Sequence, residues 1–414
     1  MKAIVLGLLA VVWGVCSFHQ KTVDETFFFA GDFKGKLTPC GCTKPMSGGL
    51  RRMATAIALF PGAKLLVNGE LLAGSGRQDE MKLESCAEAF RAMGLVAWNL
   101  AANDSQRGAG IVLSAHRLSG SRLISSSLER SDTVEIGSNV VSGKFLIGGI
   151  TSKQEKLAGN IAAQEISQDE AVKRLLSEAQ TSGLIPILLL DGSEATARQL
   201  ALSYPKLKLI QYSSQETPPK VAQKVGSTLL ISPGEYGKHV IRLKFDGQKF
   251  TGYVALDLGP EYVDNVKVSE VYSRYLDRLS GEKLLDNLPR ASEASFLGSA
   301  KCGSCHSTAY KIWKNSDHAK ALHTLEELQQ DKDPDCVGCH VLGLDSINGF
   351  KSRRLTPQFS FVGCESCHGS GVEHSQQPEQ TKMPKVTETK CLSCHTTTTS
   401  PGFEFNAHWK RIAH

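Results

Sequence analysis

The residues best suited to chemistry form a five-residue pattern, Cys-x-x-Cys-His, which occurs four times between residues 296 and 414. Positions three and four apart share one face of a helical turn, so a single turn can present both sulfurs and the imidazole to one group. Haem c attachment uses this pattern: two thioethers hold the macrocycle and the histidine ligates its iron. The cysteine pairs are Cys302 and Cys305, Cys336 and Cys339, Cys364 and Cys367, and Cys391 and Cys394, followed by His306, His340, His368 and His395.

Two other kinds of site also use Cys-x-x-Cys, namely zinc sites and redox-active disulfides. A single copy of the pattern would leave both open. Zinc ribbons, however, do not need a histidine directly after every second cysteine. Four complete copies in one segment therefore predict four covalently attached haem c groups.

Histidines are concentrated in the same segment. Besides the four in the motifs, five of the 12 histidines lie there, and only His19, His116 and His239 lie outside it. Five candidates for the second axial position of four irons suit bis-histidine ligation, and at least one must be a surface residue if each haem takes one. The five are His318, His323, His374, His408 and His414.

The C-terminal segment resembles the tetrahaem cytochrome c-554 family. The resemblance lies in the run 296–302, Trp313 to His318, the second motif with Asp335 before it, and the third motif with the Gly-x-Gly that precedes His374. It implies a mostly α-helical multihaem cytochrome c domain over residues 296–414. It also implies closely stacked haem pairs that pass electrons between a redox protein donor and an acceptor in the bacterial cell envelope.

The resemblance further implies which histidines complete the iron coordination. It assigns His374 to the first haem and His318 to the third, while the fourth should take His414 or His408 from the tail. The tail is much shorter here than in the family. The haem on His340 is the one that the family can leave five-coordinate, which keeps open a haem enzyme that reduces a small nitrogen or oxygen species.

The first 20 residues are typical of an export signal. Lys2 precedes an apolar run, residues 3–15, that is too short to span a bilayer. Export agrees with haem attachment, which takes place outside the cytoplasm, so a periplasmic location or one on the outer face of the envelope is expected. Cys16 suggests membrane attachment through lipidation, although Val15 is a poor residue before a lipoprotein cleavage site.

Composition fits two folded domains. With 41% hydrophobic and 21% charged residues, the 414-residue chain can bury an ordinary core. A formal net charge of +5 is small for this length and gives no reason to expect nucleic acid as a partner.

Residues 24–260 alternate short apolar runs with amphipathic stretches, which predicts a layered α/β domain. Strands are expected at 27–30, 64–67, 96–100, 145–148, 185–190 and 207–210, and helices at 50–59, 80–93, 169–180 and 193–203. The later runs 228–232, 240–245 and 252–256 have no helices between them and are expected to be antiparallel. Residues 261–295 should form a helical connector followed by a short linker.

This domain is similar to the 5′-nucleotidase branch of the calcineurin-like metallophosphoesterases. The likeness rests on Gly31 to Gly35 after the first strand and on Gly48 to Thr55 at the start of a helix. The family holds two metal ions with an Asp-x-His pair, a second aspartate, an Asn-His pair and further histidines. Asp32 and Asn103 fit that set. The departures from it are Lys34 and Asp104 at two histidine positions, Asn68 and Glu70 near the second aspartate, and Asp191, Gln211, Tyr212 and Ser213, which supply no imidazole.

Two histidines, His116 and His239, cannot rebuild a two-metal site, so we expect a phosphoesterase-like scaffold without hydrolysis. A phosphoester-binding protein with an electron-transfer domain remains an alternative. Cys40 and Cys42, in the loop after the first strand, form with Cys86 either a structural disulfide plus one thiol or a thiolate site. The sequence as a whole favours an electron carrier over a catalyst.

Overall fold

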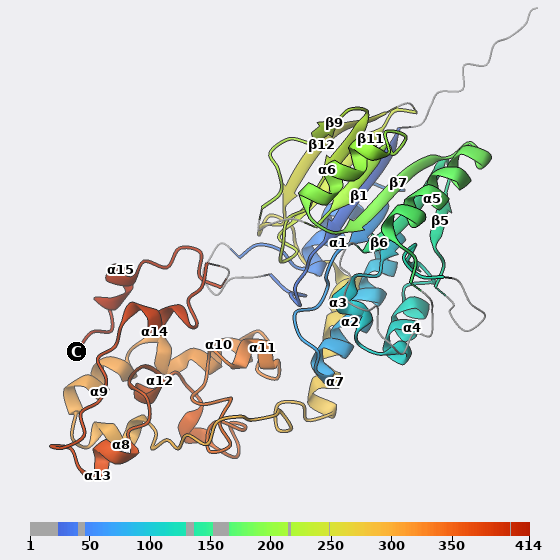
Figure 1. The fold of residues 1–414 in the computed structure, drawn as a ribbon. Coiled ribbons are helices and arrows are strands. Elements are labelled where there is room, and N and C mark those ends of the chain that lie inside the picture. Colours follow the sequence, from blue (N-terminus) through green and yellow to red (C-terminus); the bar gives the residue numbers. More distant parts are fainter. Residues whose placement is uncertain are drawn as a thin grey trace, which may run out of the picture.

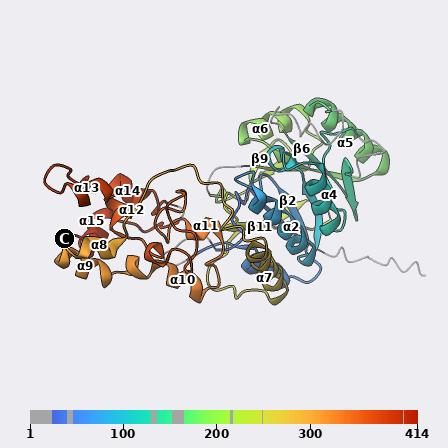
Figure 2. The ribbon, with the colours of Figure 1, turned by 90° about the horizontal axis from the view of Figure 1, so that it is seen from below.

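A computed structural model describes residues 24–39, 46–129, 136–151, 165–213, 217–247, 249–397 and 399–414. The chain forms two bodies that lie side by side, an N-terminal α/β domain and a helical C-terminal domain (Figures 1 and 2). None of the described helices is long and apolar enough to cross a membrane.

One sheet of the α/β domain has the strand order β12-β11-β1-β2-β3-β4. The three consecutive phenylalanines of β1 explain its central place, because Phe28 packs toward the helices while Phe27 and Phe29 face the second sheet. The strands are β1 Glu25–Gly31, β2 Lys64–Asn68, β3 Leu95–Asn99, β4 Leu123–Ile124, β11 His239–Phe245 and β12 Phe250–Asp257.

The second sheet has the order β5-β6-β7-β8-β10-β9. The expectation of antiparallel later strands holds for β11 with β12 and for β9 with β10, but β10 pairs parallel with β8. That parallel pairing corrects the sequence-based expectation. Strand β9 lies at the edge of the sheet, and β10 lies between β9 and β8. The strands are β5 Asn139–Ser142, β6 Phe145–Thr151, β7 Ile185–Asp191, β8 Leu209–Tyr212, β9 Gln223–Val225 and β10 Thr228–Ile231.

Helices cover the outer face of each sheet, so the domain has four layers. Buried side chains between the two sheets form one cluster, and each outer helix layer forms another with its sheet. Local signals fix the helix ends: Ser167 caps α5, which ends at the left-handed Gly183. The helices are α1 Leu50–Ala58, α2 Arg77–Ala92, α3 Ala102–Ser105, α4 Ala109–Leu118, α5 Gln168–Ser182 and α6 Glu194–Ser203.

The expected connector helix is α7, Val266–Gly281. Its apolar face, which includes Val268, Tyr272 and Tyr275, joins the core formed by α1, α2 and β1. The helix therefore packs on the α/β domain and brings the chain to the boundary with the C-terminal domain (Figure 1).

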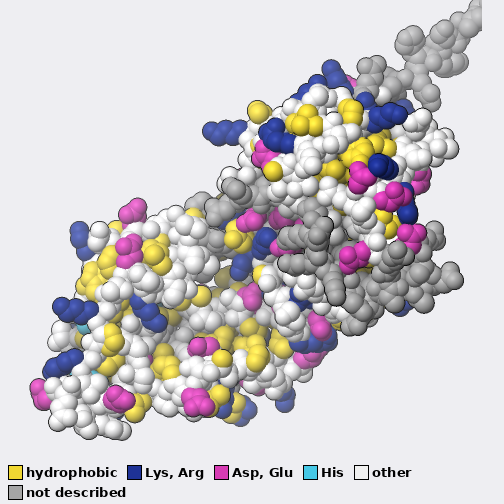
Figure 3. Space-filling model, in the orientation of Figure 1, with side chains coloured by type: hydrophobic (Ala, Val, Ile, Leu, Met, Phe, Trp, Pro, Cys, Tyr) yellow, Lys and Arg dark blue, Asp and Glu magenta, His cyan; other side chains and the backbone are white. Residues whose placement is uncertain are grey.

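The C-terminal domain consists of short helical segments joined by loops. Its described hydrophobic cluster gathers around the second motif, with Leu322, Leu325, Val337, Leu342, Phe350 and Phe359 among its members. Histidine side chains reach the surface at the edge farthest from the α/β domain (Figure 3). The segments are α8 Ser299–Gly303, α9 Ser307–Lys314, η1 Asp317–Lys320, α10 Ala321–Glu327, α11 Pro334–Val337, η2 Pro357–Phe359, α12 Cys364–His368, α13 Val372–Gln376, α14 Glu388–Leu392 and α15 Phe405–Trp409.

Candidate functional site

Each Cys-x-x-Cys-His motif lies in or directly after a short helix, namely α8, α11, α12 or α14. In the first and fourth motifs the histidine N–H donates to the carbonyl of the first cysteine, at 2.9 Å from His306 to Cys302 and 2.9 Å from His395 to Cys391. These are helical i to i−4 bonds. The turn therefore brings the two thiols and the imidazole of one motif together.

Three of the motif histidines face a second histidine across a gap of nearly constant width. The ring centroids are 6.1 Å apart for His306 and His374, 6.2 Å for His395 and His318, and 5.9 Å for His368 and His414. Imidazole nitrogens bind metal ions at about 2.0–2.1 Å, so two imidazoles on opposite sides of one ion have centroids about 6 Å apart. The three gaps fit an iron with two axial histidines.

Hydrogen bonds to Nδ1 orient several of the histidine rings and leave Nε2 as the nitrogen that could bind a metal ion. The Nδ1–H donates to the carbonyl of Ala321 from His340 at 2.6 Å, and to that of Thr381 from His374 at 2.6 Å. Nδ1 of His368 and His414 likewise meets a backbone carbonyl, at 3.2 and 3.0 Å. Such bonds fix the tautomer of metal-ligating histidines.

Burial keeps several of the rings neutral, the form that ligates metal. The pKa of His318, His340 and His395 is lowered, in each case mainly because burial disfavours the imidazolium. Ring spacing, orientation and protonation together fit the haem that the motifs require.

The pairing differs from that implied by the resemblance for two of the four motifs. His318 was expected at the third motif but faces His395 of the fourth, while His414 faces His368 of the third. The reason lies in chain placement: η1 carries His318 toward the fourth motif, and Arg411 near the end of the chain pairs with Asp317 at 3.4 Å. The pair of His306 and His374 agrees with the expectation.

The two remaining histidines have other neighbours. His323 is exposed and lies 3.3 Å from Glu326 and 3.6 Å from Glu327 on its own helix. His408 stacks near Phe403, whose other neighbour is His395 at 4.6 Å between ring centroids. His323 is therefore the surface histidine that the count required.

Thiol contacts show which motifs are neighbours. The thiol of Cys302 in the first motif lies close to that of Cys364 in the third, and the thiol of Cys394 in the fourth lies close to that of Cys339 in the second. The Cys367 thiol of the third motif also lies close enough to that of Cys391 in the fourth to affect its ionisation. The motifs therefore follow one another in space in the order first, third, fourth, second.

Glu365 joins the first and third motifs, although sequence analysis did not single it out. Its buried carboxylate accepts three backbone N–H groups, from Leu297 at 3.0 Å, Gly298 at 2.8 Å and Gly371 at 2.9 Å. Ser299 adds a bond in which its Oγ accepts from the Cys364 N–H at 3.0 Å. The sequence could not predict this role of the Glu365 carboxylate, because the N–H groups that it binds lie up to 68 residues away along the chain.

The Glu365→Ala variant should lose roughly 3–5 kcal/mol of C-terminal domain stability, because three buried N–H groups would lose a charged acceptor. Thermal unfolding followed by haem absorbance measures this loss. Glu373→Ala is the matched control, since Glu373 is exposed on the neighbouring α13 and should change stability little. Equal melting temperatures for the two variants would contradict the role of Glu365.

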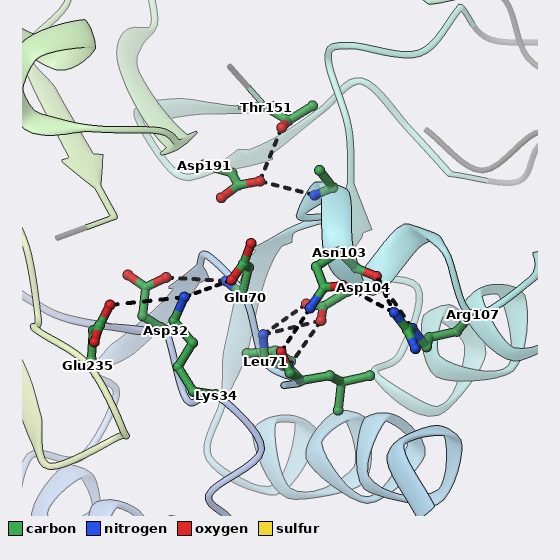
Figure 4. Close-up of polar contacts among 12 residues, drawn as sticks. Asp32, Lys34, Glu70, Leu71, Asn103, Asp104, Arg107, Thr151, Asp191 and Glu235 are labelled. Atoms are coloured by element: carbon green, nitrogen blue, oxygen red, sulfur yellow. Dashed lines mark hydrogen bonds and ion pairs between the residues drawn. The ribbon is translucent and has the colours of Figure 1, made fainter. Parts of the chain in front are cut away.

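In the α/β domain, Lys34 occupies the position of a metal-binding histidine. Its ammonium lies 2.7 Å from Glu70 and 3.9 Å from Glu235 (Figure 4). Burial alone would lower the pKa of Lys34, but Glu70 and the other nearby carboxylates outweigh it, so the pKa is raised. Lys34 is therefore held as a cation beside Asp32, whose own pKa burial raises to about 8 despite the nearby ammonium.

Neutral amides fill the strand ends where further metal ligands would stand. Asn99 Nδ2 donates to Asn68 Oδ1 at 2.9 Å, Asn68 Nδ2 donates to the Leu190 carbonyl at 2.8 Å, and Gln211 Nε2 donates to the Ala30 carbonyl at 2.8 Å. Because the amides bind one another and the backbone, they stabilise the contact between the two sheets.

The aspartates at these strand ends also bind the protein. Asp104 accepts from the N–H groups of Leu71 and Leu72 at 3.0 and 3.1 Å, and burial raises the pKa of its carboxyl to about 7. Asp191 accepts from the Thr151 hydroxyl and the Ala102 N–H, each at 3.0 Å (Figure 4). Asn103 donates to the Leu72 carbonyl at 3.0 Å.

These residues do not fit the two-metal centre of the fold family. A fixed ammonium sits among the carboxylates, and no group of three or more His, Cys, Asp or Glu able to hold a metal ion occurs in the described ranges. A cavity of about 520 Å³ remains beside Lys34, lined also by Lys36, Leu72, Ala73, Asn103 and Tyr236.

Cys40, Cys42 and Cys16 lie outside the described residues, as does the expected export signal. Cys86 is a buried free thiol on α2, and burial raises its pKa. A structural disulfide or a thiolate site at Cys40 and Cys42 thus stays a prediction.

Comparison with known proteins finds similarities for both parts of the chain. Residues 301–369 match the family described as cytochrome c554 and c-prime. The chain is 41% identical over 96 residues to cytochrome c-554 of Nitrosomonas europaea, a match that covers 20% of this chain and 41% of that protein. The match thus spans less than half of that cytochrome.

The α/β domain resembles nucleotidases in structure. For the 5′-nucleotidase precursor of Thermus thermophilus the TM-score is 0.52 at 16% identity, over 66% of this chain and 62% of that one. For the NAD nucleotidase of Haemophilus influenzae it is 0.52 at 11% identity, over 67% and 64%. This chain spans less than two thirds of each, and the likeness concerns the fold alone. The protein thus joins an α/β domain with the 5′-nucleotidase fold to a C-terminal segment similar to cytochrome c-554.

Proposed function

We propose that this protein is a tetrahaem electron carrier of the bacterial cell envelope. The observation that carries the proposal is the set of three histidine pairs with ring centroids 5.9–6.2 Å apart, each beside a Cys-x-x-Cys pair. Haem c bound there would supply iron that accepts and releases single electrons. The chain would hold that iron in closed coordination, so that no ligand need change.

In this proposal His306, His340, His368 and His395 are the proximal ligands, and the eight motif cysteines attach the haems. His374, His318 and His414 are the distal ligands of the first, fourth and third sites. The order of neighbouring motifs, first, third, fourth and second, supports a continuous path that ends at the first and second motifs. A redox donor and an acceptor would dock at these ends.

The location in the envelope rests on the leader-like first 20 residues and on the chemistry of haem attachment. Lipidation at Cys16 would tie the protein to a membrane surface and is part of the same proposal. Detergent partitioning of a Cys16→Ser variant against the unaltered protein tests it.

Carbon monoxide difference spectroscopy of the reduced protein, with haem counted in the same sample, tests the function. We expect four haems per chain and at most one equivalent of carbon monoxide bound, because carbon monoxide needs an open iron position. Two or more open irons, or fewer than four haems, would contradict the proposed carrier.

A second function is favoured by the surroundings of His340. Among the described residues, His340 is the one motif histidine without a second imidazole in ring contact. Its N–H donates to the Val337 carbonyl at 2.8 Å, and both Val337 and the adjacent Val341 belong to the hydrophobic cluster. If the iron there binds carbon monoxide, the protein is a candidate reductase of a small nitrogen or oxygen species, and turnover of nitric oxide or hydroxylamine tests this.

We propose further that the α/β domain does not hydrolyse phosphoesters. With Mn²⁺ or Zn²⁺ added, the hydrolysis of 5′-AMP and of a phosphodiester by the purified protein should stay at the rate of a protein-free blank. The physical reason is the Lys34 ammonium, which repels a metal ion at this position. A metal-dependent rate that disappears in the Asp32→Asn variant would contradict this prediction.

A further inference from the structure

The two domains meet at the second motif. Helices α2 and α7 face α11 across the boundary between the two domains (Figures 1 and 2), and side chains connect them. Lys82 Nζ of α2 lies 2.6 Å from Asp335 Oδ2, and Gln78 Nε2 of α2 donates to Asp333 Oδ1 at 2.7 Å. Asp335 directly precedes Cys336, the first haem-attachment cysteine of this motif.

The contact is charged and half-buried, because the lysine is buried while the Asp335 side chain is 40% exposed. The Lys82 side chain is 5% exposed, and although burial lowers its pKa, the carboxylate of Asp335 raises it further, so the ammonium is retained. Asp333 is also buried, and burial together with Asp335 raises its pKa to about 6. One lysine therefore faces two carboxylates at the start of the helix that carries Cys336.

Asp333 also fixes the geometry of that helix. Its carboxylate caps α11 by accepting from the Asp335 N–H at 3.0 Å, and the Tyr275 hydroxyl lies 3.5 Å from its other oxygen. The α/β domain thus holds the first turn of the second motif through Gln78, Lys82 and Tyr275. Breaking a buried ion pair by removing one partner leaves an uncompensated charge, which makes Lys82 the sensitive member.

We propose that Lys82 is a positioning residue for the second haem site: its ammonium compensates Asp333 and Asp335 and so raises the reduction potential at His340. The inference rests on the proposed attachment of haem at Cys336 and Cys339. A positive charge favours the reduced iron, which carries one positive charge fewer, and burial weakens the screening of that charge. The α/β domain would then set the potential at one end of the electron path.

The test is a spectroscopic redox titration of the full-length holoprotein at pH 8, above the pKa of Asp333. In Lys82→Met one of the four potentials should fall, while Lys82→Arg should keep it. In Lys82→Met combined with Asp335→Asn it should return toward its original value, because one charge of each sign is removed. Arg77→Met is the control, since Arg77 lies on the same helix in an exposed pair with Glu282.

Three results would overturn the inference. They are unchanged reduction potentials in Lys82→Met, an equal shift of all four potentials, or a fall in the double variant as large as that in Lys82→Met. Should Lys82→Met fail to fold, Asp335→Asn alone must raise one potential, and an unchanged value would overturn it equally. Hydrogen exchange of residues 333–337 gives a second readout, with faster exchange expected in Lys82→Met. Four redox-active haems in the unaltered protein test the proposed function separately, so the two failures are distinguishable.

Discussion

The His318→Ala variant is expected to bind one more equivalent of carbon monoxide than the unaltered protein. His318 faces His395 with ring centroids 6.2 Å apart, so removing its imidazole opens the iron held by the fourth motif. The opened iron should also become high-spin and change its reduction potential, since the axial ligand is a main determinant of that potential. Carbon monoxide titration with haem counting measures the first effect.

Which haem loses its second axial ligand in His318→Ala decides between two pairings, the one seen in this structure and the one implied by the resemblance. When His318→Ala is combined with loss of the fourth haem, through Cys391→Ala and Cys394→Ala, the extra carbon monoxide should disappear. Combined with loss of the third haem, through Cys364→Ala and Cys367→Ala, it should remain. The reverse pattern would place His318 on the third haem. His323→Ala is the matched control and should leave carbon monoxide binding unchanged, because His323 is exposed beside Glu326.

Local chemistry explains why the motif turns and the main elements could be predicted. The spacing of Cys-x-x-Cys-His already requires a helical turn, and α5 carries both its cap and its terminating glycine in the sequence. The partners of His318 and His414 could not be predicted in this way. They depend on how η1 and the last residues fold against other motifs, which no periodicity records.

In the α/β domain, too, one part of the site could be predicted from the sequence and another part could not. The resemblance alone places Lys34 where the fold family has a metal-binding histidine, so a basic side chain at this place was predictable. That Glu70 and Glu235 surround the ammonium was not, because Glu235 lies 201 positions further along the chain. The contact of Lys82 with Asp335 spans 253 positions and likewise follows only from the packing of the two domains.

In cells that cannot attach haem c, the C-terminal domain should fail to fold while the α/β domain folds. The α/β domain has three clusters of buried hydrophobic side chains, whereas the described cluster of the C-terminal domain is confined to the second motif. The helices after α7 have at most eight residues, and helices shorter than about 12 residues are marginal without tertiary packing. The macrocycles must therefore supply most of the packing surface.

Limited proteolysis with mass spectrometry measures this outcome. The apoprotein should be cut rapidly after about residue 290 and leave a resistant fragment that ends near α7, while the holoprotein remains intact at the same protease ratio. Cleavage should cover all of 296–414, because Glu365 and the histidine pairs join segments that the haems bring together. An apoprotein whose C-terminal segment resists protease as well as the holoprotein would show that side-chain packing alone stabilises the domain.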